Sequence, residues 1–112
     1  MKIKAAIIGM GIGQKHYEAI EKYQNSEVKI ICEKNQKKIN YLKKKFPNKI
    51  ITKNENKIFT NKDINLVSIA SYDNDHYSQI MKSLQSNKHV IVEKPICLEN
   101  KQLKNIYKLL KK

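Results

Sequence analysis

The sequence contains no arginine, so that all 23 of its basic residues are lysine. A lysine ammonium cannot make the bidentate contact by which arginine binds phosphate groups and reads guanine. The lysines are also spread along the chain, with one run of three at residues 43–45. The net charge of +13 therefore does not indicate a nucleic-acid-binding protein, although it attracts anionic ligands in general.

Cysteine is scarce, and long apolar runs are absent. Cys32 and Cys97 are isolated, without the spacing of a metal site or of a disulfide framework. No apolar run is long enough to cross a bilayer. The chain passes from Met1 and Lys2 directly into a strand-like run, which lacks the pattern of a secretory signal. The sequence therefore predicts a cytoplasmic protein with no metal site and no membrane partner.

The length of 112 residues and the apolar fraction of 40% predict one domain, covering residues 1–112, with a single core. Apolar runs alternate with segments of helical periodicity, which is typical of a parallel sheet covered by helices on both faces. The expected strands cover residues 3–8, 28–32, 50–51, 66–70 and 90–92. The expected helices cover residues 14–24, a segment that ends before Pro47, a short segment around 58–59, and two segments around 77–84 and 103–110. The predicted fold class is α/β, with a doubly wound parallel sheet.

Three glycines, Gly9, Gly11 and Gly13, lie between the first expected strand and the first expected helix. This is the context of a dinucleotide-binding turn, in which a pyrophosphate contacts amide groups at a helix N-terminus and glycine permits close approach. The spacing is one residue shorter than G-x-G-x-x-G, and Gln14 stands where the third small residue is expected. Taken alone, the motif indicates a structural tight turn about as well as a nucleotide site.

Glu33 follows the second expected strand, 24 residues after Gly9. An acidic residue about 20 residues after such a turn accepts hydrogen bonds from the adenosine ribose in dinucleotide-binding folds. Its carboxylate would repel a 2'-phosphate, so the sequence favours NAD over NADP. Lys34, the next residue, leaves NADP open as an alternative.

A Glu-Lys-Pro turn follows the last expected strand, at residues 93–95. It places the positive charge of Lys94 at the carboxyl edge of the sheet, where open α/β folds bind ligands. Glu93 can brace the turn by hydrogen bonding, and Pro95 can fix its geometry through a trans or a cis bond.

Together these segments resemble the Gfo/Idh/MocA oxidoreductases over essentially the whole chain. The resemblance lies in residues 9–16, 32–34, 71–76 and 88–95. It implies a Rossmann-like domain that binds a nicotinamide dinucleotide. The implied cofactor-binding residues are Gly9, Gly11, Ile12, Gly13, His16, Glu33, Lys34, Ser71, Tyr72 and Glu93.

The resemblance also implies that Lys94 is catalytic and lies near the reacting carbon of a sugar, a polyol or a related hydroxyl compound. A lysine ammonium can polarise the substrate oxygen. His76 is the second implied catalytic residue, near the nicotinamide. The alternative for His76 is that it simply begins a helix, since the three residues before it, Asp73, Asn74 and Asp75, are good capping residues. The alternative for His16 is a packing or capping role.

Members of this family carry a second domain that supplies most of the substrate pocket, and residues 1–112 contain no such segment. We therefore expect the isolated chain to bind NAD weakly, to show no turnover, and to form homo-oligomers through an exposed apolar face. The alternative hypothesis is a stand-alone nucleotide-binding or regulatory module without catalytic activity.

Overall fold

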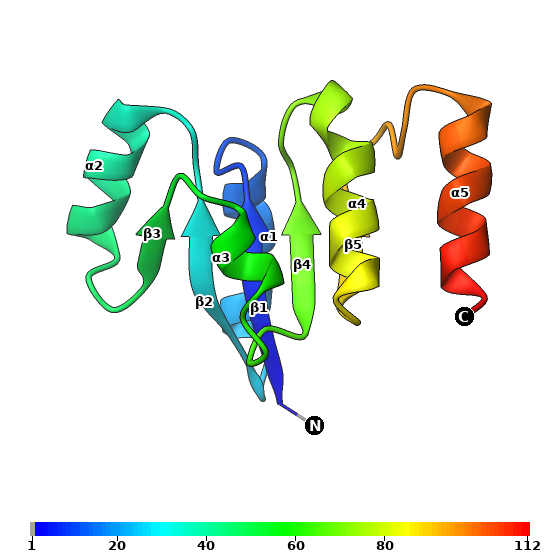
Figure 1. Cartoon of the computed structure of the whole chain (residues 1–112). Coiled ribbons are helices and arrows are strands. Elements are labelled where there is room, and N and C mark those ends of the chain that lie inside the picture. The colour runs from blue at the N-terminus through cyan, green and yellow to red at the C-terminus, as the bar shows by residue number, and fades with distance from the viewer. Residues whose placement is uncertain (1) are drawn as a thin grey trace.

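The computed structural model describes residues 2–112, and its strands form one five-stranded sheet (Figure 1). All neighbouring strands are parallel, in the order β3-β2-β1-β4-β5. The strands are β1 (Ile3–Ile8), β2 (Ser26–Cys32), β3 (Ile50–Thr52), β4 (Leu66–Ile69) and β5 (His89–Val92). Because the strands are parallel, their carboxyl ends all lie at one edge, which is at the top in Figure 1.

Five α-helices alternate with the strands in residues 2–112, and a 3₁₀ turn precedes the fourth. They are α1 (Gly13–Lys22), α2 (Gln36–Lys45), α3 (Asn56–Phe59), η1 (Asp73–Asp75), α4 (His76–Gln85) and α5 (Asn100–Leu110). In α2 the side chain of Asn35 caps the helix by accepting a hydrogen bond from the Lys38 amide. In α5 Glu99 and Gln102 form a capping box.

The core has two layers because successive side chains of β1 point to opposite faces of the sheet. Ala6 and Ile8 pack in the cluster that contains Ile58 of α3, Ile80 of α4 and Ile106 of α5. Ala5 and Ile7 pack in the other cluster, with Ile20 of α1 and Leu42 of α2. Helices therefore cover both faces, with α3 and α4 in front of the sheet and α1 behind it in Figure 1, and the predicted doubly wound fold is confirmed.

The predicted elements are present with small changes at their ends. The second strand starts at Ser26, two residues before the predicted start, because Ser26 pairs with Ile3. The first helix ends at Lys22 because the backbone of Tyr23 is already extended. Within residues 2–112 no helix is both long and apolar enough to cross a bilayer.

Strand β5 lies at one edge of the sheet and pairs only with β4 in the part of the chain that the structure describes. Its Ile91 side chain is 46% exposed. Beyond β5 the chain forms the Glu-Lys-Pro turn, in which the Lys94–Pro95 peptide bond is cis.

Lys88, the residue just before β5, is only 5% exposed. Its Nζ atom donates hydrogen bonds to the carbonyl oxygens of Asn61, at 2.7 Å, and Ile64, at 2.8 Å. Desolvation by burial lowers the pKa of this lysine. Lys88 therefore attaches the start of β5 to the loop that leads into β4.

Replacing Lys88 with methionine should lower the free energy of unfolding by about 1–3 kcal/mol, because two buried carbonyl groups lose their donor. Urea denaturation followed by circular dichroism measures this change. The matched control is Lys82→Met, which removes an exposed ion pair with Glu55 and should cost less than about 1 kcal/mol. Equal losses in the two variants would show that the buried hydrogen bonds contribute nothing specific.

Candidate functional site

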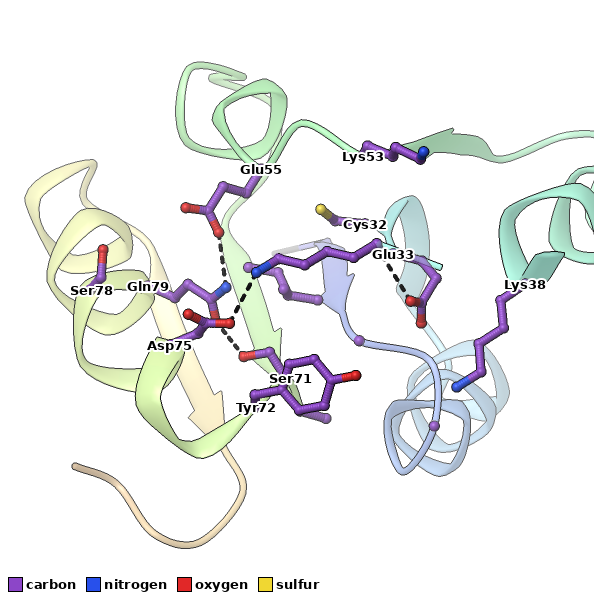
Figure 2. A pocket seen from close by; sticks show the side chains of 15 residues that line it. Cys32, Glu33, Lys38, Lys53, Glu55, Ser71, Tyr72, Asp75, Ser78 and Gln79 are labelled. Atoms are coloured by element: carbon purple, nitrogen blue, oxygen red, sulfur yellow. Dashed lines mark hydrogen bonds and ion pairs between the residues drawn. The ribbon is translucent and has the colours of Figure 1, made fainter. Parts of the chain in front are cut away.

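A cavity of about 280 Å³ opens at the carboxyl edge of the sheet, beside the ends of β1, β2 and β4. Its volume is close to the lower end of the range for small-molecule pockets, about 300–1,000 Å³. Six of the residues predicted from the sequence line this cavity: Gly9, Gly11, Glu33, Lys34, Ser71 and Tyr72. Figure 2 shows Ser71 and Tyr72 near the turn after β4, with Glu33 on the opposite side.

The glycine turn needs glycine at Gly9 and Gly13 for two different reasons. Gly9 has a φ of +88°, and a Cβ atom there would lie 2.6 Å from the carbonyl oxygen of Ala70. A Cβ atom on Gly13 would lie 2.9 Å from Cγ2 of Ile7, so Gly13 allows α1 to start close against the sheet. Gly13 thus has the close-packing role of the third small residue, and the shorter spacing of the motif still gives a complete turn.

Gly11 differs because the protein does not fill the space beside it. A Cβ atom there would meet only Nζ of Lys38, at 4.0 Å. Since Gly11 also lines the cavity, its missing side chain leaves room for a ligand next to the N-terminus of α1. A helix N-terminus attracts anions, and the nearby lysine adds positive charge.

Glu33, directly after β2, is held by three backbone amides. Its Oε1 accepts a hydrogen bond from the amide of Met10, at 3.1 Å, and its Oε2 accepts from Lys34, at 2.8 Å, and Asn35, at 2.9 Å. Burial raises the pKa of this carboxyl, but the amide hydrogen bonds and the charge of Lys38 outweigh burial and lower it overall. A carboxylate has about four acceptor positions, so an ionised Glu33 keeps one for a ligand hydroxyl.

The wall of the cavity opposite Glu33 is a polar network (Figure 2). Gln79 accepts a hydrogen bond from Ser71 Oγ, at 2.5 Å, and donates one to Glu55 Oε2, at 2.8 Å. Lys34 Nζ forms an ion pair with Asp75 Oδ2 at 3.1 Å, which connects the end of β2 to η1.

Sequence reasoning missed Lys38, Glu55, Asp75 and Gln79 as cavity residues. The polar segment around Glu55 has no pattern that marks a site. Asp75 has the sequence context of a helix-capping residue. Lys38 had a detectable signal, because it lies in the first turn of the helix that follows Glu33.

The remaining predicted residues do not line the cavity. Ile12 is exposed within the glycine turn, and Lys94 is exposed in the Glu-Lys-Pro turn. His16 lies between Ser68 and Glu93, with its Nδ1 on Ser68 Oγ and its Nε2 2.8 Å from Glu93 Oε1. His16 and Lys94 therefore lie on the β5 side of the same edge.

His76 is 1% exposed, and both of its ring nitrogens contact backbone carbonyl oxygens. Nδ1 lies 2.6 Å from Pro95 O, and Nε2 lies 3.0 Å from Ser71 O. In this arrangement the ring has no nitrogen left for a substrate. The geometry favours a bracing role over the catalytic role predicted from the sequence.

Comparison with known proteins now identifies the family. The sequence model of GFO_IDH_MocA, described as "Oxidoreductase family, NAD-binding Rossmann fold", matches residues 3–112. The chain belongs to this family. The Gfo/Idh/MocA assignment confirms the resemblance that the sequence motifs indicated, and a dinucleotide-binding Rossmann fold agrees with the glycine turn, the position of Glu33 and the strand order.

The proteins that this chain matches are considerably longer than the chain itself. An uncharacterized oxidoreductase of Synechocystis sp. is 27% identical over 108 residues, which are 96% of this chain and 29% of the relative. The scyllo-inositol dehydrogenase of Lactobacillus casei, in a structure with bound NAD(H) and scyllo-inositol, is 26% identical with a TM-score of 0.88, over 99% of this chain and 33% of the dehydrogenase. An NAD-binding protein of Listeria innocua shares the fold, with a TM-score of 0.89 at 23% identity, over 99% of this chain and 33% of that protein. The chain thus spans about a third of the length of the proteins it matches.

Proposed function

We propose that the chain is the cofactor-binding part of an NAD-dependent dehydrogenase that acts on a hydroxyl group of a sugar, a polyol or a related compound. The observation that carries this proposal is Glu33, an ionised carboxylate fixed by three amides in the cavity that the glycine turn borders. Family membership supports the cofactor. The relative with bound NAD(H) and scyllo-inositol supports the substrate class.

The residues of the cavity fit a dinucleotide. The open space at Gly11 would receive the pyrophosphate beside the N-terminus of α1. The remaining acceptor position of Glu33 would take a hydroxyl group of the adenosine ribose. When bound, the nicotinamide would supply the hydride acceptor for the oxidation of an alcohol to a carbonyl compound, and the hydroxyl proton would be released to solvent. Lys94, exposed at the same edge, would donate a hydrogen bond from Nζ to the substrate oxygen.

We also propose that the protein works in the cytoplasm. This is a reducing compartment, in which Cys32 and Cys97 remain the free thiols that the structure contains.

We further propose that the protein forms a homo-oligomer. Tyr107 and Leu110 of α5, each 61% exposed, supply apolar surface for such a contact.

Replacing Glu33 with serine should shift cofactor preference toward NADP by about tenfold, because a partly buried negative charge that opposes the 2'-phosphate is removed. Isothermal titration calorimetry with NAD and with NADP on both proteins measures the ratio of affinities.

The control for this experiment is Glu27→Gln, which removes a carboxylate near the opposite end of the same strand, where Glu27 pairs with Lys2. This variant should keep the wild-type ratio. If the Glu33→Ser protein also keeps it, Glu33 does not contact the ribose.

A further inference from the structure

The residues on both sides of Lys94 each contact a histidine. Glu93 Oε1 lies 2.8 Å from Nε2 of His16, in the first turn of α1. Pro95 O lies 2.6 Å from Nδ1 of His76, the first residue of α4. Lys94 itself is exposed and forms none of the ion pairs found within residues 2–112.

The second nitrogen of each ring is bound to β4 or to the residues just after it. His16 Nδ1 contacts the hydroxyl of Ser68, in β4, and His76 Nε2 lies 3.0 Å from the carbonyl oxygen of Ser71. Each imidazole therefore forms a bridge from the β4 segment to the turn that follows β5. Strand β4 pairs with β5. Both histidine bridges therefore continue the contact between these two segments of the chain past the last paired residues of the strands.

The partners of His16 fix the direction of its hydrogen bonds. A carboxylate only accepts, so Nε2 of His16 donates to Glu93. In the neutral imidazole Nδ1 then accepts from the Ser68 hydroxyl. The set of serine, histidine and glutamate resembles a hydrolytic triad in composition, but Ser68 is 0% exposed. Its hydroxyl cannot reach a substrate, so the three side chains serve to hold the turn.

We infer that His16 and His76 are positioning residues that fix the Glu-Lys-Pro turn from two sides, so that the ammonium of Lys94 is presented to the nicotinamide half of the cofactor and to the substrate. This inference rests on the proposed function. Lysine has a flexible four-carbon side chain, and a catalytic group must be held close to its reactive position to be effective. With the backbone fixed on both sides, only the Lys94 side chain remains to be ordered when ligand binds.

The first test uses NADH and ADP-ribose, which lacks the nicotinamide, as two ligands of the same protein. In the His16→Leu variant, the ratio of the affinity for NADH to the affinity for ADP-ribose should fall by at least about threefold. The affinity for ADP-ribose itself should stay within about twofold of wild type. Lys94→Met should give the same loss, and the double variant should lose no more than either single variant. His16→Gln, whose amide can still donate to Glu93, should restore part of the preference.

The matched control is Lys49→Met, which removes the ion pair with Glu21 near the other end of α1. The two side-chain pairs have similar exposure, with side chains 17% and 30% exposed for Lys49–Glu21 and 17% and 35% for His16–Glu93. Lys49→Met should change neither affinity. An unchanged preference in His16→Leu, or additive losses in the double variant, would overturn the inference.

The second test needs no ligand and therefore separates this inference from the proposed function. The amide of Glu93 donates to the carbonyl oxygen of Ile69 at 3.0 Å. Hydrogen exchange at this amide, measured by NMR, should be about tenfold faster in His16→Leu than in wild type and unchanged in Lys49→Met. If His16→Leu does not fold, Ser68→Ala serves in its place because it removes only the support of the ring.

Faster exchange in His16→Leu, together with a wild-type chain that binds neither NADH nor ADP-ribose, would support the fixed turn and refute the proposed function. Unchanged exchange in the folded variant would refute the positioning role, regardless of the affinities measured for NADH and ADP-ribose.

Discussion

Replacing Gly9 with alanine should lower the free energy of unfolding by about 2–5 kcal/mol. This loss combines the cost of a left-handed backbone for alanine with the cost of steric overlap. The φ of +88° is unfavourable for any residue with a side chain, and the new Cβ atom would lie 2.6 Å from the oxygen and 2.8 Å from the carbon of the Ala70 carbonyl. Neither backbone atom can move alone, because Ala70 is held to β1 by a hydrogen bond from its amide to Ile8 O, at 2.8 Å.

Urea denaturation of Gly9→Ala against wild type measures this loss, and it is large because a domain of this size is stable by only about 5–15 kcal/mol. Gly11→Ala is the control, since its Cβ atom meets nothing closer than Lys38 Nζ at 4.0 Å. Its unfolding free energy should stay within about 1 kcal/mol of wild type. A Gly9→Ala protein as stable as Gly11→Ala would mean that the backbone at Gly9 is not held as described.

Replacing Gly11 with valine should abolish NAD binding without unfolding the protein. A Cβ atom at Gly11 would meet only the flexible end of Lys38, at 4.0 Å, so a branched side chain fits the fold but fills the volume in which the backbone would approach the pyrophosphate. We expect the affinity to fall by at least about 100-fold, equivalent to about 2.7 kcal/mol.

Calorimetry with NAD tests this expectation, and thermal unfolding of the same samples establishes that the variant is folded. Gly11→Ala, with one methyl group, should give an intermediate affinity. A folded Gly11→Val protein that binds NAD like wild type would remove the pyrophosphate from this turn.

The fold could be predicted because its determinants are local. The run from Ile3 to Ile8 is apolar at nearly every position, which is the pattern of a strand buried on both faces, and Ala5 and Ala6 do pack in different layers. Glu33 could be found from its distance to the glycine turn, which the lengths of α1 and β2 determine.

The contacts of the histidines could not be predicted because they depend on tertiary packing. His16 and Glu93 are 77 residues apart, and no periodicity connects them. His76 has the sequence context of an exposed helix start, yet the cis turn at Pro95 covers it and occupies its Nδ1. Gln14 in the glycine turn suggested an imperfect motif, and only the packing of Gly13 against Ile7 shows that the turn is complete.

The position of β5 at the edge of the sheet has a consequence for handling the protein in solution. An edge strand presents backbone donors and acceptors to which another chain can add as a strand, and an exposed apolar side chain such as Ile91 makes this addition more favourable. The net charge of +13 opposes such aggregation by repulsion between molecules, but about 1 M salt shortens the screening length to about 3 Å. Solubility should therefore fall as ionic strength rises, and dilute buffers of low salt content suit the protein best.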